Sequence, residues 1–254
     1  FSWNLTTAYT IWAGVLGGAV FTMASHGTDQ LIVQRLLTCR DQRSAQKALI
    51  GSGVVVIFQF LLFLMVGIGL WAFYEGAAFD STDEIFATFI VQQLPPGLTG
   101  LLIAGVFAAA MSSLSSSINS LASATAYDYW APLAGARDDE VRILKAGKIF
   151  TLVWAALLIG GATLFIPLSK GTSAVEVALG VAALVYGGLL GVFALGVLTK
   201  KPGQTAAIIG VVVGIGSVTL LRGVMAWPWY VPTGATITLI VGWLAGFAFP
   251  KRFV

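Results

Sequence analysis

Long apolar stretches separated by short polar connections dominate this 254-residue sequence, and they restrict the folds open to it. A helix that crosses a membrane needs about 20 mostly apolar residues. Seven stretches approach that length, and none shows the period-2 alternation of a membrane-barrel strand. Their approximate bounds are 8–25, 48–74, 98–127, 146–168, 174–199, 205–221 and 234–249. The sequence therefore predicts an all-α membrane protein, with residues 1–254 as a single domain of seven transmembrane helices.

The charge content leads to the same class and excludes others. Only 10% of the residues are charged, whereas soluble domains carry about 25%. We therefore expect most of the protein surface to contact the lipid bilayer. Lys and Arg do not cluster on one soluble face, as nucleic-acid binding requires, so no nucleic-acid partner is expected. The sequence holds one histidine and one cysteine, and we find no metal-ligand or phosphate-loop motif. An enzyme is therefore not expected.

The basic residues give the expected orientation. Alternate connections, together with the segment after the last span, hold twelve of the fourteen Lys and Arg residues, and connection 75–97 holds none. Basic connections stay in the cytoplasm, which predicts an integral protein of the cell (inner) membrane with Phe1 outside and Val254 inside. Because Phe1 lies close to an apolar stretch, we also expect an upstream portion to be missing.

Two connections are expected to be partly helical. Residues 81–84, Ser-Thr-Asp-Glu, match a capping box, in which the serine and glutamate side chains bond each other's backbone amides. Apolar residues follow at helical spacing until Pro95, which predicts a short helix on the membrane surface. The connection 27–47 mixes polar and apolar residues and is expected to be helical in part.

The third predicted span carries an unusual run of serines. Six polar residues fall on one stripe of a helix, at steps of three and four: Ser112, Ser115, Ser116, Asn119, Ser120 and Ser123. Hard cations favour oxygen ligands, so hydroxyl groups could replace part of the hydration shell of sodium. The alternative is that small residues allow close helix packing and that the hydroxyls bond within the bundle.

Few other polar side chains lie inside the predicted spans. Thr22 and Ser25 lie near the inner end of the first span, Gln59 lies well inside the second and Tyr186 lies in the fifth. His26 is the sole histidine and ends the first span. Contact with a transported solute is one interpretation of these residues, and structural hydrogen bonding is the other. Charged residues are nearly absent at bilayer depth, which disfavours a proton relay.

Two sequence blocks resemble a known family. The segment His-Gly-Thr-Asp-Gln at 26–30, continuing to Arg35, is similar to a cytoplasmic loop of the sodium/solute symporter family. Pro-Pro-Gly-Leu-Thr-Gly-Leu at 95–101, leading into Ala-Ala-Met-Ser-Ser at 109–113, resembles the sodium-site helix of that family. The spacing between the two blocks also fits.

The resemblance implies a fold and an ion. The family has a LeuT-like core of two inverted five-helix repeats. This chain would be the second repeat plus two peripheral helices, partnered by missing N-terminal helices of the same protein. The Ala109 carbonyl and the Ser112 and Ser113 hydroxyls match positions that bind Na⁺, and Ser115 and Ser116 resemble the serines of a further sodium site.

The implied solute is less specific. Sugar-transporting members place an asparagine and a tyrosine where this chain has Thr22 and Ser25, and a lysine near Val56. Phe58-Gln59 and the glycine-rich fifth span look more like the branch that carries monocarboxylates, iodide and vitamins. The candidate solute-binding residues are Thr22, Ser25, His26, Gln59 and Tyr186.

The expected function is sodium-coupled secondary active symport of a small organic solute or anion by alternating access. The alternative is a membrane-embedded, solute-sensing input domain of a signalling protein, since related membrane domains can precede signalling modules.

Overall fold

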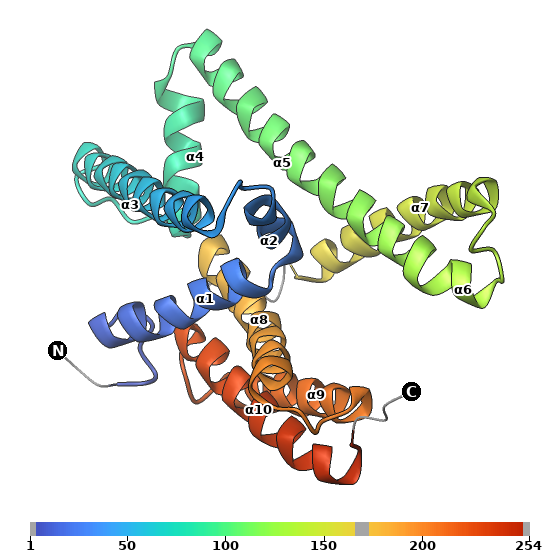
Figure 1. The fold of residues 1–254 in the computed structure, drawn as a ribbon. Coiled ribbons are helices and arrows are strands. Elements are labelled where there is room, and N and C mark those ends of the chain that lie inside the picture. The colour runs from blue at the N-terminus through green and yellow to red at the C-terminus, as the bar shows by residue number, and fades with distance from the viewer. Residues whose placement is uncertain (1–3, 166–172, 251–254) are drawn as a thin grey trace. The chain divides into compact units, whose positions relative to one another are not determined.

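A computed structural model describes residues 4–165 and 173–250, which form helices joined by short connections (Figure 1). Within these residues there is no strand, and one isolated β-bridge pairs Pro202 with Pro250. The α-helices are α1 Gly18–Thr28, α2 Gln30–Leu37, α3 Gln42–Phe73, α4 Thr82–Gln93, α5 Pro96–Ala124, α6 Ala131–Leu133, α7 Glu140–Phe165, α8 Ala174–Leu198, α9 Gln204–Leu221 and α10 Tyr230–Ala248. Two π-helical turns, η1 Ala13–Gly17 and η2 Thr125–Trp130, and a 3-10 turn, η4 Trp227–Trp229, adjoin them.

Six helices of the described residues are long and apolar enough to cross a membrane, where the sequence predicts seven spans. Their bounds are Gln42–Phe73, Pro96–Leu133, Glu140–Leu164, Ala174–Leu198, Gln204–Leu221 and Trp227–Ala248. The predicted span 8–25 is not one of them. Its residues form η1 and the 11-residue α1, which ends in polar side chains. The end of predicted span 146–168 lies outside the described residues.

The helices α3 and α7 begin well before the apolar stretches that predicted them. In each case an aspartate precedes the first helical residue and accepts a hydrogen bond from a backbone amide of the first turn. Asp41 Oδ1 accepts from the Ser44 amide at 2.7 Å, and Asp139 Oδ1 accepts from the Arg142 amide at 3.0 Å. These caps satisfy amides that have no partner inside the helix. The polar first turns are therefore helical, although their composition is not that of a membrane span.

Two compact units make up the chain, and each is described by itself. The first unit comprises Phe1–Met65 and Ala174–Val254. In it, α8, α9 and α10 pack side by side (Figure 1). Glycines allow their backbones to approach closely: a Cβ at Gly187 would lie 3.2 Å from Gly234 Cα, and one at Gly210 would lie 2.7 Å from Thr238 O. Small residues commonly serve this purpose between membrane helices.

The core of the first unit also receives α1. Ala24 of α1 is fully buried and belongs to one apolar cluster with Ala183 of α8, Val218 of α9 and Val231 of α10. The C-terminal half of α1 is therefore held against the bundle formed by α8, α9 and α10.

The second unit, Val66–Ser173, contains α4, α5 and α7. Thr99 Oγ1 of α5 donates to the Ile90 carbonyl of α4 at 3.0 Å, and Trp154 Nε1 of α7 donates to Thr125 Oγ1 at 2.9 Å. Ser81 precedes α4 as predicted, but its hydroxyl accepts from the Asp83 amide at 3.3 Å. The Glu84 amide, which the predicted box pairs with the Ser81 hydroxyl, donates instead to the Ser81 carbonyl at 3.2 Å.

Candidate functional site

The residues predicted to bind solute and those predicted to bind sodium fall in different units of the structure. The first set lies on α1, α3 and α8 of the first unit, and the second set lies on α5 of the second unit. Each set is therefore described separately.

Three of the five predicted solute-binding residues share the last turns of α1. Ser25 Oγ lies 2.9 Å from His26 Nδ1, and both atoms lie 3.1 Å from the Thr22 carbonyl. Because Ser25 Oγ has one proton and His26 Nδ1 is either protonated or not, the tautomer decides which group donates. The Thr22 carbonyl accepts from Ser25 Oγ, and it accepts from His26 Nδ1 as well only in the tautomer that is protonated there. This small polar cluster is exposed at Thr22 and buried at Ser25.

Tyr186 joins this end of α1 from α8. Its hydroxyl donates to Asp29 Oδ2 at 2.9 Å, and its ring lies edge-to-face on Phe21, with centroids 5.5 Å apart. Asp29 follows α1 directly, and its backbone leaves the helical region at φ −76° and ψ 115°. Its carbonyl also accepts from the Ile32 and Val33 amides at the start of α2. One residue therefore fixes the corner between α1 and α2 and links it to α8.

Gln59 is not brought to this cluster. Its side chain is exposed on α3, and no bond from it to the other four predicted residues is found among the described residues. Its role in solute binding stays a prediction.

The predicted sodium ligands lie on two consecutive turns of α5, and all five residues are exposed. Ala109, Ser112 and Ser113 stand at positions i, i+3 and i+4, so they share one face of the helix. Ser113 also supplies a carbonyl, which accepts from Ser117 Oγ at 3.0 Å. Ser115 and Ser116 continue this face by one turn.

The donor atoms of this face fit a monovalent hard cation. Within residues 4–165 and 173–250 there is no group of three or more His, Cys, Asp or Glu residues that could hold a metal. The oxygens that α5 itself offers are the uncharged hydroxyl and carbonyl groups named above. Three oxygens from one turn do not complete a coordination shell, so further ligands must come from elsewhere.

We call Thr22, Ser25, His26 and Tyr186, with Asp29 and Phe21 that contact Tyr186, the α1 cluster. Sequence reasoning missed Asp29 and Phe21 as parts of this cluster. A signal for Asp29 was present, because it is an acidic residue three positions after His26 in a largely uncharged segment. The hydrogen-bond partner of Asp29 could not be predicted from the sequence, because Tyr186 is 157 positions away in the chain.

Comparison with known proteins gives the family. The family model described as the sodium:solute symporter family matches residues 3–214, which is most of the chain. The chain belongs to the sodium:solute symporter family. The resemblance seen in the two sequence blocks is thereby confirmed.

Several relatives of this chain are named as sodium-coupled or sodium-dependent transporters. The sodium/sialic acid symporter NanT of Aliivibrio fischeri is 28% identical over 259 residues, covering 99% of this chain and 51% of the relative. A putative sodium-dependent multivitamin transporter of Drosophila melanogaster is 30% identical over 228 residues, covering 85% of this chain and 37% of the relative. The human sodium-coupled monocarboxylate transporter 1 is 27% identical over 234 residues, covering 89% of this chain and 38% of the relative. The chain thus spans about half, or less, of the length of these relatives.

Proposed function

We propose that this chain is part of a sodium-coupled secondary active symporter for a small organic solute or anion. The observation that carries the proposal is the family match over residues 3–214, together with relatives named as sodium-coupled transporters. The oxygen-rich face of α5 supports sodium as the coupling ion, because it offers hard donor atoms without a fixed charge. Membership of a transporter family also supports a function other than catalysis.

In this proposal the Ala109 carbonyl and the Ser112 and Ser113 hydroxyls bind sodium, and Ser115 and Ser116 serve a further ion. Sodium binding from outside stabilises an outward-facing state with higher affinity for the solute, and this difference in affinity is the coupling. The membrane potential adds about 2.3 kcal/mol per charge per 100 mV. The inward sodium gradient and the membrane potential acting on the sodium charge then drive the coupled solute inwards.

The solute-binding part rests on the α1 cluster. Thr22, Ser25 and His26 offer donors and acceptors at the end of α1, and Tyr186 and Gln59 complete the proposed set. The solute class follows from the relatives, because sialic acid and monocarboxylates share a carboxylate group. A carboxylate needs hydrogen-bond donors, and hydroxyl and imidazole groups supply them.

The proposed architecture is the second repeat of a LeuT-like fold with two peripheral helices. Its partner is a first repeat contributed by N-terminal helices of the same protein, which would supply the remaining ligands. The orientation proposed from the basic connections places Phe1 outside and Val254 in the cytoplasm of the cell (inner) membrane.

Uptake by the full-length gene product in proteoliposomes tests this function. Labelled carboxylates, amino acids and sugars are offered with and without an inward sodium gradient. The proposal predicts sodium-dependent accumulation of at least one solute, with carboxylates first. Solute binding without accumulation would contradict symport and favour the sensor.

A further inference from the structure

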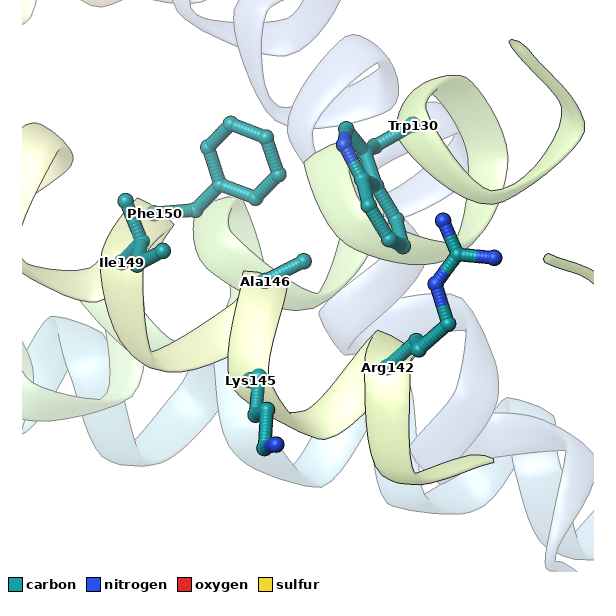
Figure 2. A pocket seen from close by; sticks show the side chains of 6 residues that line it. All are labelled: Trp130, Arg142, Lys145, Ala146, Ile149 and Phe150. Carbon is teal, nitrogen blue, oxygen red and sulfur yellow. The ribbon is translucent and has the colours of Figure 1, made fainter. Parts of the chain in front are cut away.

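An open pocket of about 290 Å³ lies in the second unit, between η2 and the first turns of α7 (Figure 2). Six residues line it: Trp130, Arg142, Lys145, Ala146, Ile149 and Phe150. None of these residues belongs to the proposed sodium or solute sets. The pocket is therefore a separate feature of the chain.

Two cations line this pocket. The Arg142 guanidinium lies 5.9 Å from the centroid of the Trp130 ring, which holds the cation over an aromatic face without neutralising its charge. Figure 2 shows Arg142 turned towards this ring, whereas the Lys145 side chain extends the other way from α7. In the part of the chain that the structure describes, no carboxylate forms an ion pair with either residue. The nearby Asp139 accepts from the Arg142 backbone amide.

The rest of the lining is apolar. Ala146 is buried, and Ile149 and Phe150 lie further along α7, with Phe150 on the side of the picture away from Arg142 (Figure 2). The pocket lies where α7 passes from the polar segment 137–140 to its apolar membrane-crossing part. Such a boundary is the depth at which phospholipid headgroups meet acyl chains.

We propose that this pocket binds an anionic phospholipid, with its headgroup phosphate at Arg142, the positive charge of Lys145 nearby on the same helix, and an acyl chain along Ile149 and Phe150. The charge of the two cations complements a phosphate, and Arg in particular presents several donors to phosphate oxygens. The apolar wall complements the acyl chain, which a free phosphate compound would leave uncovered. Basic pockets beside membrane helices bind acidic headgroups in this way.

The test measures lipid binding to the protein in nanodiscs by native mass spectrometry, with phosphatidylglycerol against phosphatidylcholine. The pocket variant is Arg142→Gln with Lys145→Gln. The matched control is Arg137→Gln with Lys148→Gln, which removes the same charge from exposed residues that do not line the pocket. Both variants lose the general attraction of two basic residues to an acidic lipid surface, but only the pocket variant loses a direct bond to the phosphate. Phosphatidylglycerol affinity should therefore fall by about tenfold more in the pocket variant than in the control.

Hydrogen exchange of the unmodified protein provides a second readout that does not depend on the folding of a variant. Phosphatidylglycerol should slow exchange in residues 130–150 more than phosphatidylcholine does. Equal protection by both lipids, or an equal loss of affinity in the control variant, would overturn the proposal. Binding of glycerol phosphate as tight as that of the lipid would also overturn it, because the ligand would then be a soluble phosphate compound.

Discussion

At the scale of single residues, Asp29 has three structural tasks. It ends α1, its carbonyl accepts the first amides of α2, and its carboxylate accepts from Tyr186 of α8. A hydrogen bond to a charged acceptor contributes about 1.5–3 kcal/mol, more than a bond between neutral groups. The Tyr186 hydroxyl is therefore expected to hold the α1–α2 corner as well as to border the proposed solute site.

Replacing Tyr186 with phenylalanine tests this role. Tyr186→Phe keeps the ring contact with Phe21 but removes the hydrogen bond to Asp29. We therefore expect the free energy of unfolding to fall by about 1.5–3 kcal/mol and the amides of Ile32 and Val33 to exchange faster. Tyr230→Phe is the matched control, since its hydroxyl makes only a 3.4 Å bond to a neutral carbonyl. Equal exchange at the corner in both variants would contradict the role.

The aspartate before α3 provides a pH-dependent prediction. Bonds from the Ser44 amide and hydroxyl lower the pKa of the Asp41 carboxyl below its ordinary value. The cap is then fully formed above the ordinary pKa of about 3.9 and is lost as the pH falls through the lowered pKa. Protection of the Ser44 amide, corrected for intrinsic exchange, should fall with acidification in the unmodified chain.

Two substitutions separate the cap from other effects of pH. Asp41→Asn retains a capping oxygen that does not titrate, so its Ser44 protection should stay constant with pH. Asp41→Ala should lose the protection at every pH. If Asp41→Ala protects Ser44 as well as the native residue does, the cap does not stabilise the start of α3.

At the scale of elements, apolar length predicted the existence of the helices better than their ends. Hydropathy detects only the part of a helix that faces lipid or core, so the capped polar turns of α3 and α7 were not included in the predicted spans. Pro96 begins α5, where its missing amide has no intrahelical partner to lose. The first predicted span is not among the six long apolar helices, because α1 has only 11 residues and is followed by Asp29, whose backbone is extended.

Helix packing in the first unit gives a prediction with a control on the same helix. A Cβ at Gly210 of α9 would lie 2.7 Å from Thr238 O and 3.1 Å from Gly242 Cα, whereas one at Gly216 would meet nothing within 4 Å. Both contacting atoms at Gly210 belong to the backbone, which cannot move aside as readily as a side chain. Gly210→Ala should therefore destabilise the bundle by about 1–3 kcal/mol.

The measurement is the unfolding midpoint of both variants in the same detergent. Gly216→Ala should leave the midpoint unchanged or raise it slightly, because alanine favours the helix. Equal midpoints for the two variants would show that α9 and α10 do not pack as closely as described.

At the scale of the whole molecule, sequence reasoning predicted the class, the family and most of the spans. The class follows from apolar length and charge content, and the family from two blocks whose spacing is specific. The α1 cluster was predicted only in part, because Asp29 and Tyr186 are distant in sequence and their bond depends on how α8 packs. Gln59 was chosen for its polarity alone, and no described contact links it to the cluster.

The central claim is that sodium bound on α5 drives transport, and a sodium titration of solute uptake tests it most directly. In the full-length gene product, Ser112→Ala and Ser113→Ala should each raise the sodium concentration for half-maximal uptake by about tenfold, the effect of losing roughly 1.4 kcal/mol of binding. Ser117→Ala is the control, since its hydroxyl donates to its own helix. Unchanged sodium dependence in both Ser112→Ala and Ser113→Ala would contradict a sodium site on α5.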